Sequence, residues 1–411
     1  MPSSNSPASA GAPPRDRAAA GAFRLVAGGF LGMMAGAGAP SPVYRVYQQD
    51  WGFSPSIVAL VFVVYVIALL AALLGFGELS DRVGRRRVLV VSLLVLAGAM
   101  LLFAAARGLP EVLLARIVQG FATGAATGAF GASVIDLQTR PQLGSYVTAV
   151  APTLGPGAGA LLSAILIDVL PWPRRTVFVA LAALYLVVAL LIHRVRADSL
   201  DVRRPVAGGT RIRFALPPGF RGPFLRFAPT LIAAWSVGGL FLALAPSFMP
   251  VVFGVRGGIA GALTIVVLPG AGAVTASLLR PRPATAWRTL IACAGLAAGT
   301  AVLIMGVGVG SAGVFLLGCL LAGIAFGAAL FLATAVLGRA IPPAQRSGVL
   351  SVIFVVNYLA FAVPPLLAGV CATRFGFVPT LLVYLCAAAG LSVLAAAALV
   401  RPARDEGRRH V

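Results

Sequence analysis

The sequence predicts an all-α polytopic membrane protein with twelve transmembrane helices in two six-helix halves. Three observations support this fold class. First, 60% of the 411 residues are apolar and 10% are charged, against roughly 25% charged in a soluble domain. Second, the apolar residues gather in runs long enough to cross a bilayer. Third, the longest polar stretch lies near the middle of the chain. A soluble enzyme and a disordered chain are excluded, because so few charges cannot cover that much apolar surface.

The residue types that the chain lacks exclude several kinds of site. All 32 basic residues are arginine, so the chain has no Walker A loop, which needs lysine. The two histidines, His193 and His410, are too few for a histidine-rich zinc site. The four cysteines lie inside apolar runs, where we expect them to pack as small apolar residues. We therefore expect no metal, no cofactor and no enzyme activity.

The order of the elements follows from the charge-free runs. The first residues are rich in Pro, Ser, Ala and Gly, so we expect a disordered N-terminal tail over 1–21. Ten spans are expected at 25–44, 57–77, 88–106, 112–135, 143–167, 176–192, 227–255, 257–279, 347–373 and 375–400. Two more lie within the charge-free stretch 289–338, with a turn at Gly306 to Gly313 between them. Among these runs, 112–135 is interrupted by a charge, Arg116.

The polar stretch 193–226 divides the spans into two sets of six. We expect a basic cytoplasmic linker there, between an N-terminal bundle at 22–192 and a C-terminal bundle at 227–400, with a C-terminal tail at 401–411.

Two sequence features recur in the second half at nearly the same distance along the chain, which indicates that the halves are copies of one unit. Ala39-Pro40-Ser41 recurs as Ala245-Pro246-Ser247, 206 residues later, and Pro156 and Pro364 are 208 residues apart. Paired repeats with helices broken by Gly and Pro place a substrate site at the membrane midplane, between the halves.

The arginines predict the orientation. With the N-terminus in the cytoplasm, 25 of them fall on the cytoplasmic side, 6 fall outside and Arg116 lies within a span. The positive-inside rule then places both termini in the cytoplasm, and we expect the bacterial inner (plasma) membrane. Because the arginines are scattered among loops without interleaved aromatic residues, we expect them to attract anionic lipid and not nucleic acid.

The loop after the second span carries the most specific motif. It reads Gly77-Glu78-Leu79-Ser80-Asp81-Arg82-Val83-Gly84-Arg85-Arg86-Arg87. This closely resembles the signature of the major facilitator superfamily, Gly-x-Leu-(Ala or Ser)-Asp-Arg-x-Gly-Arg-(Arg or Lys), and implies the fold of that family. The alternative is an ordinary positive-inside loop. The resemblance implies a conformational latch formed by Gly77, Asp81, Arg82, Gly84, Arg85, Arg86 and Asp136. In it, Asp81 would contact the second half near the eleventh span and Arg85 would pair with Asp136.

The fourth span contains Arg116-Ile117-Val118-Gln119-Gly120, which is similar to the Arg-x-x-Gln-Gly motif of the family. An arginine within the hydrocarbon costs about 2.5–3.5 kcal/mol on insertion scales, and a polar cavity or a partner normally offsets this cost. The resemblance implies a transport role for Arg116 and Gln119, which Glu111 or Asp168 could tune. The alternative is an arginine whose side chain snorkels outward to the headgroups.

The fifth span resembles the antiporter motif of the family, Gly-x-x-x-Gly-Pro-x-x-Gly-Gly. The matching residues are Gly155, Pro156 and Gly159, whereas Ala151 and Ala160 stand where glycine is usual. In the family this motif marks exporters that exchange substrate for protons. The alternative is ordinary packing of small residues between helices.

The acids and the aromatic residues bear on coupling and on the substrate. None of the eleven acids falls in the middle of a span, so proton coupling would need an acid near an interface. We favour Asp136, because loss of its arginine partner would favour the protonated form. Candidates for the substrate cavity are Tyr65, Tyr146, Trp235, Phe354, Asn357 and Tyr358. A site without fixed charge except Arg116 suits apolar, neutral or anionic substrates.

The leading hypothesis is a secondary active transporter that exports hydrophobic, drug-like molecules by alternating access, in exchange for protons. The second hypothesis is a facilitator or importer of a small organic metabolite with the same fold. A non-transporting scaffold or sensor is the third. The expected partners are a small-molecule substrate, protons and membrane lipid, and we expect a monomer.

Overall fold

A computed structural model describes residues 14–76, 83–138, 143–195, 216–255, 258–341 and 346–400. Over these residues the chain is all-helical, and twelve helical segments are long and apolar enough to cross a membrane. The helices of the first half are α1 (Pro14–Gly38), α2 (Pro40–Trp51), α3 (Pro55–Phe76), α5 (Arg85–Ala105), α6 (Leu109–Asp136), α7 (Leu143–Val169) and α8 (Thr176–Arg194). Those of the second half are α10 (Pro218–Phe253), α11 (Gly258–Leu279), α12 (Ala286–Gly308), α13 (Ala312–Ala340), α14 (Arg346–Phe375) and α15 (Phe377–Val400).

The predicted turn between the two spans of 289–338 is confirmed. Helix α12 ends at Gly308, and Gly310 has a φ of 66°, a conformation that glycine adopts without steric cost. The Ser311 side chain then accepts a hydrogen bond from the backbone N–H of Val314 and caps α13. A charge-free stretch therefore divides where glycine ends one helix and serine begins the next.

Two predicted boundaries are wrong at the ends of helices. Helix α1 begins at Pro14, inside the tail expected to be disordered, and α10 begins at Pro218, inside the expected linker. In both cases proline stands in the first turn, where it suits a helix start, and the alanines at 18–20 favour helix. The prediction used the loss of apolar character, but helices continue past the hydrocarbon into water. Residues 1–13, 196–215 and 401–411 lie outside the described residues.

The two copies of the Ala-Pro-Ser segment have different backbones. In the first half the helix is interrupted at Ala39, and Pro40 begins the separate helix α2. In the second half α10 runs through Pro246 without interruption. Close packing accompanies the interruption, because a Cβ atom at Gly38 would lie 1.9 Å from the backbone oxygen of Pro156 on α7.

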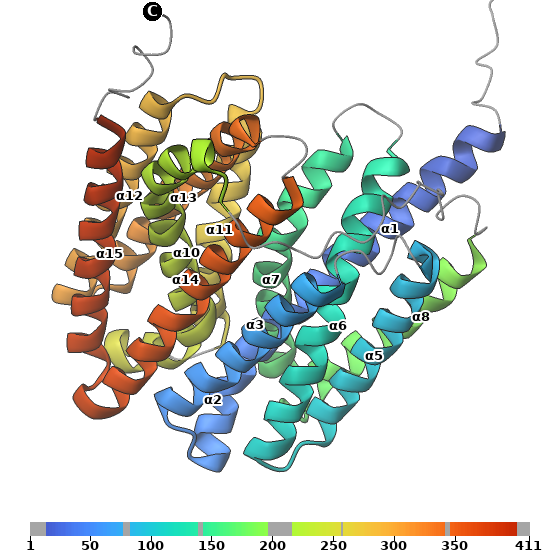
Figure 1. Cartoon of the computed structure of the whole chain (residues 1–411). Helices are drawn as coiled ribbons and strands as arrows, with labels where there is room; N and C mark the ends of the chain where they lie inside the picture. Colours follow the sequence, from blue (N-terminus) through green and yellow to red (C-terminus); the bar gives the residue numbers. More distant parts are fainter. Residues whose placement is uncertain are drawn as a thin grey trace, which may run out of the picture.

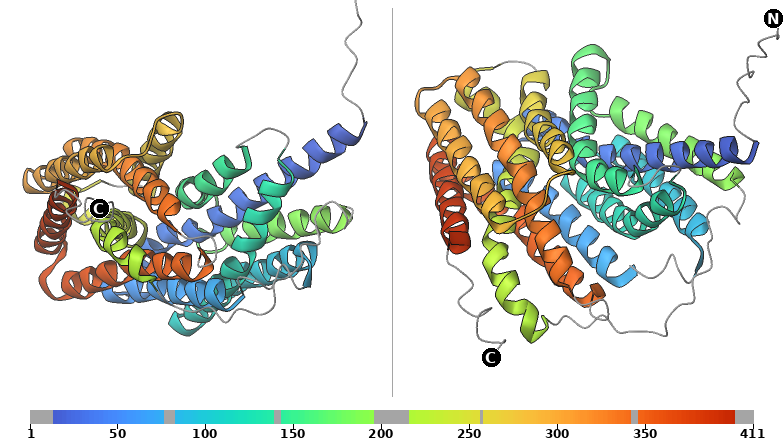
Figure 2. Two further views of the ribbon diagram at one scale, coloured as in Figure 1. Left: turned by 45° about the horizontal axis from the view of Figure 1, so that its top comes forward. Right: turned by 90° about the horizontal axis from the view of Figure 1, so that it is seen from above.

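The helices form two bundles that meet along matching faces. Helices α1–α8 lie on one side and α10–α15 on the other (Figures 1 and 2). The bundles touch mainly where α3 packs on α14 and where α7 packs on α11. In the order of the spans, these contacts join span 2 to span 11 and span 5 to span 8. Spans 2 and 8 hold equivalent positions in the two halves, and so do spans 5 and 11, so the two contacts are equivalent to each other. The interface thus supports the interpretation of the chain as a duplicated unit.

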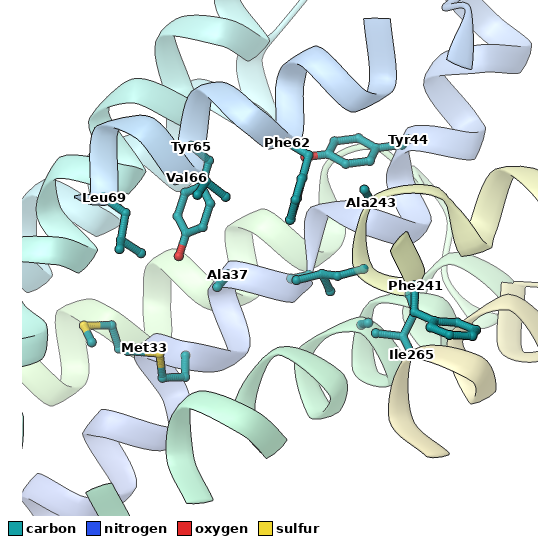
Figure 3. Close-up of a cluster of buried hydrophobic side chains, with 14 of the residues drawn as sticks. Met33, Ala37, Tyr44, Phe62, Tyr65, Val66, Leu69, Phe241, Ala243 and Ile265 are labelled. Atoms are coloured by element: carbon teal, nitrogen blue, oxygen red, sulfur yellow. The ribbon is translucent and has the colours of Figure 1, made fainter. Parts of the chain in front are cut away.

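The core continues from one half into the other. Buried side chains of α1, α3, α10 and α11 belong to one cluster, with Met33, Tyr65, Phe241 and Ile265 among them (Figure 3). Large apolar residues also lie on the outside, such as Ile67 at 58% exposure and Val187 at 54%. An apolar exterior is expected where lipid tails surround the helices.

Candidate functional site

Among the described residues of the first half, the most completely buried charge is Arg116 on α6, whose side chain is 0% exposed. Its Nε donates to the hydroxyl oxygen of Tyr44 at 2.7 Å, and its Nη2 donates to the same oxygen. Its Nη1 donates to Oε1 of Gln119 at 2.7 Å and to the backbone oxygen of Ala37 at 3.5 Å. The guanidinium therefore joins α6 to both pieces of the interrupted first span.

Aromatic rings surround the same guanidinium. Its central carbon lies 4.9 Å from the ring centre of Tyr65, 5.4 Å from that of Tyr44 and 5.7 Å from that of Phe103. Tyr65 projects from α3 toward Ala37 on α1 (Figure 3). Cation–π contacts of a desolvated arginine contribute about 2 kcal/mol or more, so the rings help to offset the cost of a buried charge.

Gln119 extends this network to the backbone of α1. Its Nε2 donates to the backbone oxygen of Gly36 at 2.6 Å, and its Oε1 accepts from Arg116. At the next residue, a Cβ at Gly120 would lie 2.5 Å from the backbone oxygen of Tyr65, so this glycine lets α6 approach α3. The Arg-x-x-Gln-Gly motif thus fixes α1, α3 and α6 to one another.

The structure contradicts the snorkelling alternative for Arg116, because its guanidinium is buried and has partners inside the protein. The side chain neither snorkels to the membrane surface nor lines the cavity described below. Among the described acids, none lies within ion-pair distance of it, so Glu111 and Asp168 do not pair with it. Its main partner, the Tyr44 hydroxyl, was missed, because the two residues are 72 positions apart in the sequence.

Besides the network around Arg116, a second group of polar residues lies at one end of the molecule. This is the end where α8 ends and α10 begins, and we call it the linker end. There Arg85 donates to Asp136, with exposed fractions of 4% and 14%. Arg86 donates to the backbone oxygen of His193. Gly84 has a φ of 101°, which favours glycine. Of the expected latch, the structure brings Arg85 and Asp136 together, whereas Gly77, Asp81 and Arg82 lie outside the described residues.

The Gly-Pro segment of α7 packs on two helices. A Cβ at Gly155 would lie 2.3 Å from the Cβ of Met34, and one at Gly159 would lie 1.8 Å from the backbone oxygen of Ala35, so both glycines face α1. A Cβ at Gly157 would lie 3.2 Å from the backbone oxygen of Ile265 on α11. This segment, with Pro156 inside the helix, therefore lies between the first span and the opposite half.

A cavity of about 60 Å³ lies beside this segment, between the halves. Its α7 wall includes Thr153, Pro156 and Gly157, and the opposite half contributes α10, α11, α13 and α14. Four aromatic side chains line it, namely Trp235, Phe241, Phe326 and Phe361. None of its lining residues carries a charge. We call this space the central cavity.

The six candidate cavity residues occupy different places. Trp235 lines the central cavity, and its ring centre lies 6.2 Å from that of Tyr358. Tyr65 instead stacks on Arg116, and Tyr146 stacks on Arg280 of the opposite half at 5.0 Å. Tyr358, Phe354 and Asn357 are also absent from the lining. Phe354 is 40% exposed, and Asn357 is buried with no hydrogen-bond partner for its Oδ1 among the described residues.

Sequence reasoning missed Phe361, which connects the two halves. Its ring centre lies 5.3 Å from that of Trp235 and 5.2 Å from that of Phe62 on α3. A signal was present, since Phe361 follows Tyr358 by three residues and shares its helix face. The halves also touch at the end opposite the linker, where the backbone N–H of Ser56 donates to Oγ1 of Thr373 at 3.0 Å.

Comparison with known proteins gives the family. A family model described as Major Facilitator Superfamily matches residues 25–362. YdgK of Bacillus subtilis, an uncharacterized MFS-type transporter, is 27% identical over 58% of this chain and 64% of its own. The multidrug resistance protein MdtL of Klebsiella pneumoniae is 28% identical over 35% of this chain and 36% of its own. The 4-hydroxybenzoate transporter PcaK of Pseudomonas putida is 27% identical over 42% and 38%.

These matches each cover less than two thirds of the relative. A solved structure covers more. A bacterial homologue of the human lysosomal transporter Spinster, in an inward-facing conformation, superposes with a TM-score of 0.71. It is 17% identical, and the match covers 95% of this chain and 98% of that one. Twelve spans, the fold and the family model agree, and the chain belongs to the Major Facilitator Superfamily, whose members are membrane transporters and not enzymes.

Proposed function

We propose that the chain exports neutral, apolar small molecules by alternating movement of its two halves, in exchange for protons. The observation that carries the substrate class is the lining of the central cavity, which is aromatic, comes from both halves and contains no charged residue. Such a wall offers dispersion and apolar burial without ionic selection. At about 60 Å³ the space is smaller than the 300–1,000 Å³ of typical ligand pockets, so the halves must separate to admit a substrate.

The burial of Arg116 supports a neutral substrate. Its donors are taken up by Tyr44, Gln119 and Ala37 inside the first half. An anionic substrate would have to displace these bonds, and charged hydrogen bonds contribute about 1.5–3 kcal/mol each. We assign Arg116 and Gln119 the role of holding the interrupted first span in place while the halves move.

Proton exchange is assigned to the linker end. The Arg85–Asp136 pair is largely buried there, and Asp136 is the acid whose arginine partner would move away from it when this end opens. In this proposal Gly77, Asp81, Arg82, Gly84, Arg85, Arg86 and Asp136 form a latch that opens once per cycle. The packing of Gly155, Pro156 and Gly159 between α1 and α11 supports the resemblance of this segment to the antiporter motif.

The arginine distribution supports an orientation with both termini in the cytoplasm. The matched relatives come from bacteria, which supports the bacterial inner membrane as the location. A monomer is sufficient, because both halves of the cavity come from one chain.

The second candidate function is uptake of a small aromatic metabolite. Two observations favour it, namely the aromatic lining of a small cavity and the match to a relative named as a 4-hydroxybenzoate transporter. That substrate is an anion, however, and none of the residues that line the central cavity is positively charged. We therefore rank export of neutral compounds first.

The test is retention of a panel of fluorescent and antibiotic compounds in a bacterium that lacks its own efflux pumps. Phe361→Ala removes a ring of the central cavity, and Phe354→Ala, on the same helix but exposed, is its matched control. We expect the unaltered chain and Phe354→Ala to lower accumulation of some neutral compounds, and Phe361→Ala to lose this effect. A protonophore should restore accumulation.

Two results would contradict the proposal. If no compound is depleted although the protein is present in the membrane, export of apolar compounds is wrong. If instead an aromatic acid accumulates in cells that carry the chain, the uptake function replaces it.

A further inference from the structure

A second and larger cavity lies within the C-terminal half. It measures about 750 Å³ and is bounded by one face each of α10, α14 and α15. Helices α14 and α15 share a turn at Gly376, whose φ is 82°, and they diverge from that turn (Figure 1). On α14 the lining runs from Pro364 to Phe375, and on α15 from Pro379 to Leu391. We call this space the lateral groove.

The lateral groove is apolar. None of its fourteen lining residues carries a charge. The hydroxyl of Tyr384 donates to the backbone oxygen of Ser236 at 2.7 Å, and that of Thr380 donates to the backbone oxygen of Gly376 at 2.7 Å. Both hydroxyls of the α15 wall therefore donate within the protein. A ligand with polar groups would lose its own hydrogen bonds to water here, so the groove favours a hydrocarbon.

The groove is open toward the lipid and spans the depth of one leaflet. Residues on its rim are strongly exposed, with Val383 at 72%, Phe375 at 68% and Leu367 at 59%. The wall from Pro379 to Leu391 is about 18 Å long at 1.5 Å per residue. Half of a hydrocarbon core about 30 Å thick is about 15 Å. An acyl chain that enters beside the α14–α15 turn would reach the inner end of the groove near the midplane.

The lateral groove is separate from the central cavity. Helix α10 presents Trp235 to the central cavity and Ser236 to the groove. All three walls belong to the C-terminal half, so movement of one half against the other leaves the groove intact. An occupant of the groove would accordingly stay in place while the substrate is carried.

We propose that the lateral groove holds one acyl chain of a phospholipid from the leaflet beside the α14–α15 turn. The acyl chain fills the space between the diverging parts of α14 and α15, and so it takes the place of protein packing there. This lipid is a bound structural ligand and not the transported substrate.

Native mass spectrometry of the full chain in detergent with added palmitoyl-oleoyl phosphatidylglycerol tests the proposal. Ala387→Trp places an indole in the groove, and Ala397→Trp, exposed on the same helix outside the groove, is the matched control. We expect the unaltered chain and Ala397→Trp to retain one phospholipid more than Ala387→Trp. Equal retention in all three proteins would overturn the proposal.

A second measurement needs no substitution. The unaltered chain is reconstituted with a phosphatidylcholine that carries a photoactivatable diazirine in one acyl chain, and the crosslinked peptides are mapped. Labelling should be several-fold higher on 364–391 than around Val91 and Val187, which are 58% and 54% exposed to lipid in the other half. Equal labelling at all of these places would overturn the proposal. Neither measurement depends on transport activity.

Discussion

Replacing Tyr44 by phenylalanine removes one oxygen from the surroundings of Arg116, the most buried charged side chain among the residues that the structure describes. The hydroxyl accepts hydrogen bonds from two nitrogens of Arg116, and both side chains are almost fully buried. The phenyl ring stays, so the cation–π contact is retained and the change isolates the hydroxyl. Hydrogen bonds to charged groups contribute about 1.5–3 kcal/mol. We expect a loss of this size in the free energy of unfolding.

The matched control is Tyr185→Phe. Tyr185 is buried in the same bundle, and its hydroxyl donates to the neutral backbone oxygens of Gly32 and Met33, both at 3.4 Å. Neutral hydrogen bonds contribute about 0.5–1.5 kcal/mol, so the control should lose less. Unfolding of the purified protein by sodium dodecyl sulfate in mixed micelles measures both. The difference should be about tenfold in the unfolding constant, at 1.36 kcal/mol per factor of ten. An equal or smaller loss for Tyr44→Phe would refute the assignment of Tyr44 as the main partner.

Two further substitutions test the packing of α7 and the ion pair at the linker end. Gly159→Ala would place a methyl group 1.8 Å from the Ala35 backbone oxygen, so it should abolish the folded, monodisperse peak in size-exclusion chromatography. The control Gly28→Ala, whose new methyl group would have nothing within 4 Å, should keep this peak. A normal peak for Gly159→Ala would show that α1 and α7 pack differently. Asp136→Asn removes a carboxylate from the buried Arg85 and should cost about 3 kcal/mol in the same unfolding assay. Asp50→Asn, whose partner Arg174 is 42% exposed, should cost under about 1 kcal/mol, and equal losses would mean that the Arg85 pair is not buried.

The sequence was sufficient for the spans and the fold, because the bilayer imposes length and polarity on every helix. The turn near Gly310 was predicted correctly, since glycine and a capping serine mark it locally. The starts of α1 and α10 were not, because charged residues do not end a helix once it has left the hydrocarbon.

The site was less predictable than the fold. The motifs identified Arg116 and Gln119, but the partner Tyr44 depends on how the first span is interrupted at Ala39. Of the aromatic residues proposed for the cavity, Trp235 alone lines it. A side chain on a buried helix can face any of the neighbouring helices. Contacts between the two halves decide which helix it faces, and the nearby sequence does not predict these contacts. Phe361 shows this, since its neighbours Phe62 and Trp235 come from two different halves.

The most direct test of the account is transport by the purified chain in proteoliposomes. A neutral apolar dye that the cell panel selects is added outside, and a pH gradient is imposed with the lumen acidic. We expect dye uptake that collapses when an ionophore dissipates the gradient. Phe361→Ala should lower this uptake about tenfold or more, as expected for the loss of about 1.5–3 kcal/mol of aromatic burial, whereas Phe354→Ala should leave it unchanged. Uptake that ignores the gradient, or that falls equally in both variants, would contradict proton-coupled export through the central cavity.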